Sequence, residues 1–156
     1  MSNKHYYQIN TQWCDNNGKG TSHYKSYSRN HSIYNKSKKK IDCSADPAFM
    51  GDSDKYNPEE LLLASVSACH MLWYLHLCAI SGVVVIDYSD NAAAVMEESG
   101  MKGGRFTSIT LYPVVLVKSE DMIATALKLH EKANELCFIA NTLNIKVGHK
   151  AVVRSF

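Results

Sequence analysis

One uninterrupted apolar stretch near the middle of the chain constrains the fold more than any other feature. No Lys, Arg, Asp or Glu occurs from Leu61 to Ile80, a length of about five and a half helical turns. Asn57 is a suitable N-cap, Pro58 suits the first helical position, and Gly82 can end the helix in a left-handed conformation. We therefore expect one long helix between Asn57 and Gly82.

A helix of this length and composition either spans a membrane or is buried within a protein. Histidines, cysteines and serines are scattered through it, and no basic cluster lies directly beside it. We therefore expect a central helix that is buried on all sides, and no membrane. A chain of 156 residues has limited material to surround such a helix, so a second subunit is expected to complete its burial.

The composition narrows the class of protein. The length favours a single domain over residues 1–156, and a net charge of +2 gives no indication of a nucleic-acid partner. Residues 1–10 lack the apolar run of a secretory signal, and the five cysteines contain no CxxC pair, so we expect reduced thiols in the cytoplasm. The seven histidines show no metal-binding spacing, and no metal is expected.

Short runs of β-branched and aromatic residues predict strands on both sides of the central helix. The expected strands are residues 6–13, 21–28, 32–34, 40–43, 83–88, 91–96, 105–117 and 145–153. The turn at residues 16–20 predicts antiparallel pairing of the first two strands, and 91–96 is expected beside 83–88. Pro113 requires an edge, a bulge or a bend within the long run.

A second long helix is expected from Ser119, as N-cap, to about Leu143. Apolar residues recur there at helical spacing, with Lys and Glu on the opposite side, and Cys137 lies on or beside the buried face. The order of the predicted elements, strands before, between and after two helices, indicates an α+β domain.

Two cysteines are candidates for chemistry. Cys69 and Cys78 are nine residues apart on one helix and point to opposite sides, so they cannot form a disulfide with each other. If the two long helices pack together, Cys69 and Cys137 could meet. Such a pair suits reaction with a peroxide, in which one thiolate becomes a sulfenic acid and the other thiol resolves it as a disulfide. Buried cysteines are also commonly inert, and both readings stay open at this point.

The stretch NPEELLLASVSAC, residues 57–69, resembles the motif around the reactive cysteine of the OsmC/Ohr family of hydroperoxide reductases. A cysteine in the second long helix is also similar to that family. The resemblance implies an OsmC-like fold, with antiparallel sheets around two long helices and an intertwined homodimer. Four further segments resemble a less studied OsmC-like branch of the family: residues 22–31, 46–52, 69–79 and 136–141.

The resemblance also implies roles for individual residues. Cys69 would be the peroxidatic thiol and Cys137 the resolving thiol, although Phe138 stands where better known members commonly have proline. Glu59 would match a glutamate that holds a catalytic arginine, for which Arg29 is the best candidate. Glu59 precedes Cys69 by ten residues, about 15 Å along a helix, so it cannot touch the Cys69 of its own chain. We therefore expect Glu59 to come from a twofold partner, with the sites at the subunit interface.

These expectations describe a cytoplasmic homodimeric peroxiredoxin that reduces organic hydroperoxides. It would need no metal or prosthetic group, only an external dithiol reductant. The alternative is a non-enzymatic protein of the same fold that binds a small apolar ligand or senses oxidation. In either case His70 and His76 are expected to be packed, hydrogen-bonded histidines and Cys78 a core residue. His130 could line the pocket beside Cys137, but packing is expected for it too.

Overall fold

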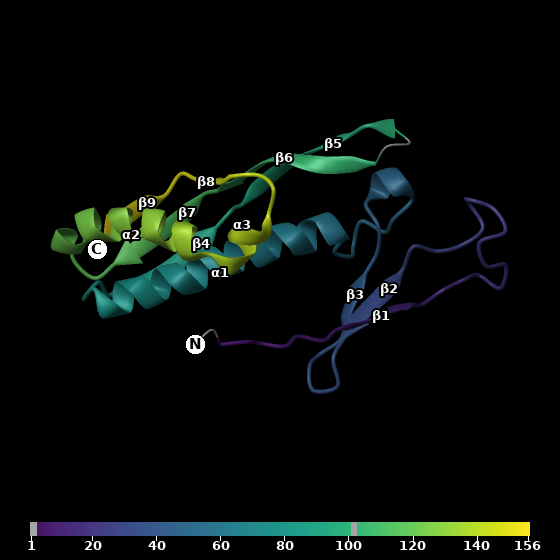
Figure 1. Cartoon of the computed structure of the whole chain (residues 1–156), viewed down its shortest axis with the longest axis horizontal. Helices are drawn as coiled ribbons and strands as arrows, with labels where there is room; N and C mark the ends of the chain where they lie inside the picture. Colours follow the sequence, from purple (N-terminus) through teal and green to yellow (C-terminus); the bar gives the residue numbers. More distant parts are fainter. Residues whose placement is uncertain (1–2, 101–102) are drawn as a thin grey trace. The chain divides into compact units, whose positions relative to one another are not determined.

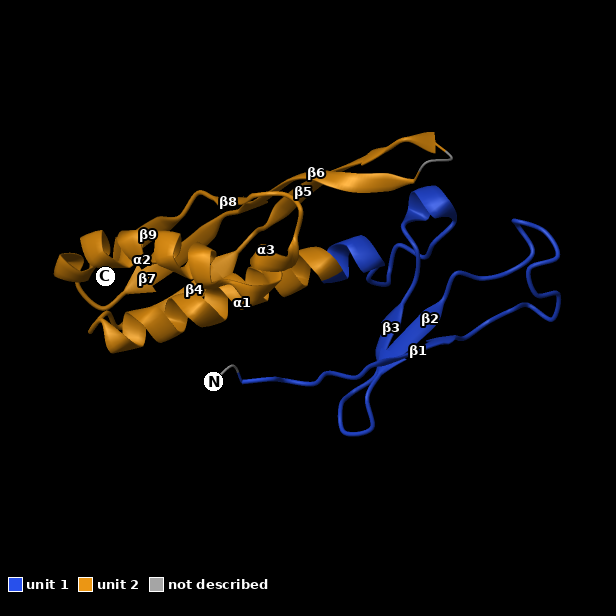
Figure 2. Ribbon diagram, viewed as in Figure 1, with its two compact units in different colours: residues 1–61 blue, residues 62–156 orange. Residues whose placement is uncertain are grey.

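The computed structural model describes residues 3–100 and 103–156 and divides the chain into two compact units. The first unit comprises residues 1–61 and the second residues 62–156 (Figure 2). The α-helices and strands of each unit are labelled in Figure 1. The expectation of one domain over residues 1–156 stays a prediction.

A three-stranded antiparallel sheet organises the first unit. Its strands are β1 (Asn10–Trp13), β2 (His31–Tyr34) and β3 (Ile41–Cys43), in the order β1-β2-β3. Thr11 pairs with Ile33, and Ile33 pairs with Ile41. A 3-10 turn, η1 (Pro47–Phe49), follows, capped by the side chain of Asp46.

The expected strand over residues 21–28 is wrong. This segment consists of consecutive turns, and β1 pairs directly with β2 instead. Asn17, Gly18 and Gly20 all have positive φ, which breaks an extended chain. The Ser26 hydroxyl donates to the backbone carbonyls of Gly20 and His23 at 2.8 Å, which holds the loop in its turns.

Helix α1 (Pro58–Ile80) begins and ends where the sequence predicts. The Glu60 backbone N–H donates to the Asn57 side chain at 2.8 Å, and the Asn57 N–H donates to the Glu60 carboxylate at 3.0 Å. These two bonds form a capping box that satisfies donors left free at a helix start. Beyond the C-terminus Gly82 has φ +74°, and the Val83 N–H donates back to the Cys78 carbonyl.

Two mixed sheets build the second unit. One contains β4 (Val85–Asp90), β7 (Pro113–Val117) and β9 (Val152–Ser155), in the order β4-β7-β9. The other contains β5 (Ala93–Glu98), β6 (Gly104–Leu111) and β8 (Val147–His149), in the order β5-β6-β8. The β4–β7 and β5–β6 pairs are antiparallel, whereas β6–β8 and β7–β9 are parallel.

This topology corrects three expectations about strands. The predicted run 105–117 divides at Tyr112, whose N–H donates to the Asp90 carboxylate at 2.7 Å, and Pro113 begins the next strand. The predicted run 145–153 likewise divides between the two sheets. The segments expected to pair, 83–88 and 91–96, lie in different sheets.

The second long helix is shorter than expected. After a 3-10 turn, η3 (Glu120–Met122), helix α2 (Ile123–Leu136) stops one residue before Cys137. Cys137 has an extended backbone, with φ −65° and ψ 109°, and a separate helix α3 (Phe138–Thr142) follows. Ser119 precedes η3, but its side chain makes no capping hydrogen bond.

Helix α1 packs through one face, not all round. Its buried side chains are Val66, His70, Tyr74, Leu77 and Cys78, and a hydrophobic cluster joins the last three to Ala126 and Ala133 of α2 and to β7. A second cluster joins Val66 to β6 and β8. Leu72 and Ile80 remain 63% and 69% exposed, so this chain alone does not give the expected all-round burial.

Helix α1 also has the length and composition of a membrane span, the only such helix in the described part of the chain. Core helices of soluble proteins share this property, so it is weak evidence for a membrane.

Candidate functional site: a dithiol between two helices

The thiols of Cys69 and Cys137 are brought together where α1 meets the junction between α2 and α3. Cys69 lies in α1 and is half-buried, whereas Cys137 is completely buried. The Cys137 Sγ lies 4.0 Å from the Val66 carbonyl oxygen of α1, to which the thiol can donate. The same sulfur accepts the Ala140 N–H at 3.4 Å and so caps α3.

The environment of Cys137 keeps it a thiol. Burial raises the Cys137 pKa to about 11, and the neighbouring Cys69 side chain is the next largest cause of the rise. The N–H of Ala140 acts in the opposite direction but does not outweigh burial. The structure therefore places the Cys69 and Cys137 side chains beside each other, and Cys69 is the more exposed of the two.

Aromatic rings flank this dithiol. Trp73 is one turn after Cys69 on α1, and Phe138 directly follows Cys137. The two rings pack edge to face with centroids 5.4 Å apart, and the His76 ring lies 5.9 Å from Trp73. Phe138 is 67% exposed, so this pair presents apolar surface beside the dithiol.

The other cysteines have ordinary structural environments. Cys78 is buried in the cluster between α1 and α2, and burial raises its pKa. Cys43 is buried and Cys14 exposed in the first unit, and all five cysteines are free thiols. The interpretation of Cys78 as a core residue is confirmed.

Two buried histidines form a pair on the same helices. His70 Nε2 and His130 Nδ1 are 3.0 Å apart, and both side chains are completely buried. The His130 ring also stacks on Tyr74, with centroids 3.8 Å apart. The sequence analysis predicts each histidine as a separate packed residue and does not predict the pair. The helical spacing could have indicated it, because His70 shares the buried face of α1 with Tyr74, and His130 shares the buried face of α2 with Ala126 and Ala133.

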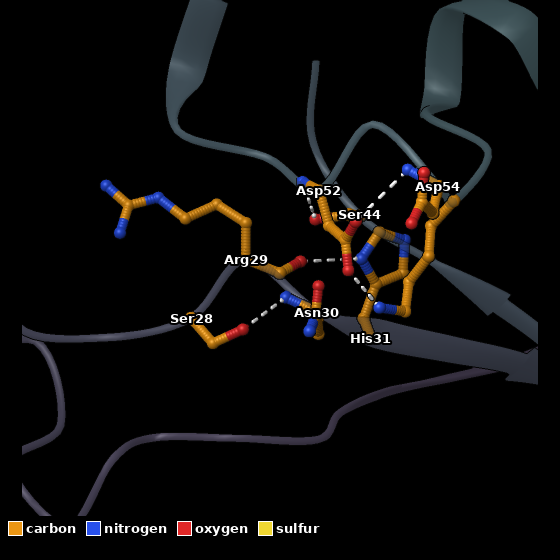
Figure 3. Close-up of polar contacts among 8 residues, drawn as sticks. Ser28, Arg29, Asn30, His31, Ser44, Asp52 and Asp54 are labelled. Carbon is orange, nitrogen blue, oxygen red and sulfur yellow. Dashed lines mark hydrogen bonds and ion pairs between the residues drawn. The ribbon is translucent and has the colours of Figure 1, made fainter. Parts of the chain in front are cut away.

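Arg29 lies in the first unit and is engaged locally. Its guanidinium donates to the backbone carbonyls of Tyr24 and Tyr27, both at 2.6 Å, and lies 4.6 Å and 4.0 Å from the centroids of their rings. Figure 3 shows the Arg29 side chain extending away from Asp52 and Asp54. These contacts hold the loop before β2 together, and an approach of Arg29 to a thiolate stays a prediction.

Glu59 also belongs to the first unit, in the first turn of α1, and is half-buried. Its neighbour Glu60, and not Glu59, closes the capping box with Asn57. An acidic side chain at this position interacts favourably with the positive end of the helix dipole. Its role towards an arginine stays a prediction.

The described residues contain no group of three or more His, Cys, Asp or Glu side chains arranged to hold a metal ion. A hollow of about 300 Å³ does open on the second unit, lined mainly by aliphatic side chains of α1, β6 and the segment after α3, with Arg105 and Asn144 as polar members.

Comparison with known structures agrees with this fold. An OsmC-like protein of unknown function from Vibrio cholerae is 26% identical, with a TM-score of 0.84 over 96% of this chain and 100% of its own. An organic hydroperoxide resistance protein OsmC from Legionella pneumophila is 20% identical, with a TM-score of 0.65 over 96% of this chain and 98% of its own. An OsmC-like protein from Mycoplasma pneumoniae is 16% identical, with a TM-score of 0.68 and 99% coverage of both chains.

A search of the curated proteins found no match. The family model described as OsmC-like protein matches residues 51–150, which include the central helix and both cysteines of the dithiol. The α+β fold, the dithiol between two helices and this match over most of the chain agree, and the chain belongs to the OsmC-like family.

Proposed function

We propose that this protein is a thiol-dependent peroxidase that reduces organic hydroperoxides. The observation that carries the proposal is the pairing of a half-exposed thiol, Cys69, with a buried one, Cys137, in a chain whose structural neighbours include organic hydroperoxide resistance proteins. An accessible thiol can meet a substrate, and a second thiol beside it can resolve the product.

The proposed reaction has two steps. The Cys69 thiolate attacks one oxygen of ROOH, the O–O bond breaks, and Cys69 becomes a sulfenic acid while the leaving alkoxide takes a proton to give ROH. The Cys137 sulfur then attacks the Cys69 sulfur, the S–O bond breaks, and the thiol proton of Cys137 leaves with the hydroxyl as water. An external dithiol reduces the resulting disulfide, so no metal or prosthetic group takes part.

The raised pKa of Cys137 gives the two thiols different roles. Because Cys137 stays protonated near neutral pH, the first reaction with the peroxide falls to Cys69. The aromatic edge formed by Trp73 and Phe138 provides apolar surface for the organic part of the substrate.

We further propose that the working unit is a homodimer in the cytoplasm. The exposed apolar side chains of α1, among them Leu72 and Ile80, support a second subunit on this helix. Glu59 of that subunit, and an arginine that it holds, would complete the site. If Arg29 is this arginine, its guanidinium has to exchange its contacts with Tyr24 and Tyr27 for the thiolate.

The test is peptide mapping of the non-reduced protein after one equivalent of cumene hydroperoxide. We expect a Cys69–Cys137 disulfide in the wild type, no link in Cys69→Ser, and a Cys69 sulfenic acid that dimedone traps in Cys137→Ser. Cys78→Ser is the matched control, because Cys78 is a buried cysteine of the same helix outside the dithiol, and it should form the link normally. Slow oxidation without a Cys69–Cys137 link in the wild type contradicts the proposal.

A second candidate function rests on the hollow beside Arg105. A volume of about 300 Å³ with a mainly aliphatic lining suits a small apolar ligand, and the cysteines would then only pack or sense oxidation. Saturable binding of such a ligand, together with a Cys69 that does not react with cumene hydroperoxide, favours this candidate over the peroxidase.

A further inference from the structure

The contact between α1 and α2 carries two polar pairs in close succession. On α1, Cys69 and His70 are neighbours in sequence, and on α2 and its end, His130 and Cys137 are separated by two turns. The imidazole pair and the dithiol therefore depend on the same placement of one helix against the other. Apolar packing around them includes the small side chains Ala126 and Ala133, which let the helices approach closely, and the polar pairs add directional contacts to it.

The hydrogen bond between His70 and His130 is specific in a way that apolar contacts are not. One ring has to donate and the other has to accept, with the two nitrogens 3.0 Å apart and the ring planes 6° from parallel. A shift of either helix by a fraction of a turn removes the bond and leaves polar atoms in the core without a partner, at a cost of about 1–3 kcal/mol. The pair thus favours one register of α2 on α1.

The pair is stable in the core only when both rings are neutral. The outer atoms, His70 Nδ1 and His130 Nε2, are buried and have no hydrogen-bond partner among the described residues. One added proton keeps the central bond but creates a buried charge and two unpartnered N–H donors, and a second proton removes the acceptor that the bond needs.

The surroundings disfavour that charge. Burial is the main cause that lowers the pKa of both rings, and His149 of β8, with centroids 5.7 Å and 6.0 Å away, lowers both pKa values further. Asp90 of β4 acts in the opposite direction on His70 but is outweighed by burial. The remaining titratable neighbours, Tyr74, Tyr88 and Cys78, have pKa values raised by burial and stay neutral.

We propose that the His70–His130 pair positions the dithiol: its hydrogen bond holds α2 in the register on α1 that brings Cys137 within bonding reach of Cys69. Disulfide geometry is narrow, with Cα atoms about 4.4–6.8 Å apart, so a small change of register slows closure strongly. This inference rests on the proposed function, since it concerns the second step of that reaction. The two histidines are positioning residues, because their ring nitrogens bond to each other and not to a thiol.

The test compares two double variants of the pair. His70→Gln with His130→Asn replaces the rings by amides that place a donor and an acceptor near Nε2 and Nδ1 but do not titrate. His70→Leu with His130→Leu keeps apolar bulk without the hydrogen bond. His76→Gln, a change of an exposed histidine on α1, is the control.

Each protein is oxidised with one equivalent of cumene hydroperoxide, quenched at intervals, and analysed by mass spectrometry for the dimedone-trapped Cys69 sulfenic acid and for the Cys69–Cys137 disulfide. We expect the leucine pair to form the sulfenic acid at the wild-type rate but to close the disulfide at least tenfold more slowly. The amide pair and the His76→Gln control should close at the wild-type rate.

A parallel series with diamide, which takes two electrons and two protons from a dithiol, measures closure without any peroxidase activity. If peroxide leaves Cys69 unchanged while diamide still shows the expected order of variants, the proposed function fails and the positioning role stands. The positioning role is overturned if the leucine pair forms the disulfide at the wild-type rate, or if the amide pair forms it as slowly as the leucine pair. It is also overturned if diamide forms no Cys69–Cys137 disulfide in the wild-type protein. Should circular dichroism show the leucine pair to be unfolded, the single variant His130→Leu, which also removes the central hydrogen bond, takes its place. Closure at the wild-type rate by that variant then overturns the positioning role.

Discussion

Acidification should unfold this protein by adding protons to two imidazoles that the folded chain keeps neutral. The His70 pKa is lowered to about 4 and the His130 pKa to about 3, in both cases mainly by burial. In an unfolded chain each returns to about 6.5. Below that value the unfolded state therefore binds more protons than the folded state, and stability falls as the pH falls.

The size of the effect follows from the same shifts. Each imidazole contributes a loss of about 1.4 kcal/mol per pH unit below about 6.5, hence about 2 kcal/mol at about pH 5 and about 4 kcal/mol for the pair. The loss continues until the pH reaches the folded-state values near 4 and 3. Above about pH 7.5 the pair should contribute no pH dependence.

The measurement is urea unfolding followed by circular dichroism at several pH values between about 8 and 5, at one protein concentration. Carboxylates also titrate in this range, so the amide double variant, His70→Gln with His130→Asn, serves as the reference. The wild type should lose about 4 kcal/mol more than the variant between about pH 8 and about pH 5. Parallel stability curves for the two proteins would refute the reasoning, because they would mean that the folded chain accepts these protons without cost.

Three further changes test other parts of the fold. Asn57→Ala removes the capping box with Glu60 and should lower the free energy of unfolding by about 1 kcal/mol in urea titrations, without a change in the extent of α1. Gly51→Ala places a Cβ 1.6 Å from the backbone oxygen of Ala45, so it should cost about 3 kcal/mol or more and lower the melting temperature, whereas an unchanged melting temperature would contradict that close approach. Tyr88→Phe removes a buried hydroxyl that has no hydrogen-bond partner among the described residues, so calorimetry should show equal or greater stability, and a loss above about 1 kcal/mol would reveal a partner.

The features that the sequence predicts correctly are those determined by residues close together in the chain. The ends of α1 follow from Asn57, Glu60 and Gly82, each of which acts within a few residues of the helix end that it defines. Most strand positions were also predicted, because β-branched runs carry their preference locally. The pairing of the strands was not predicted, because the separation of β4 from β5 into different sheets depends on partner strands that are distant in sequence.

The errors near the candidate site have similar causes. Tyr24 and Tyr27 were typical of a strand, but their rings pack on Arg29 and the segment forms turns. The break in the second helix was missed because Cys137 ends one helix and caps the next with its sulfur, a role that a cysteine rarely signals in sequence. The meeting of Cys69 and Cys137 was foreseen only as a possibility, because no local pattern fixes how two helices cross.

The break at Cys137 has a mechanical consequence. Because Cys137 alone separates α2 from α3, the adjustment of its φ and ψ that a disulfide with Cys69 requires can be taken up at this one residue while both helices stay straight. We expect the short helix α3 to change its orientation with this adjustment, and the exposed Phe138 ring to move with it against Trp73. Oxidation inside the core would thus become visible at the surface, where a reducing partner could tell a closed disulfide from an open dithiol, and Trp73 fluorescence should change as the bond forms.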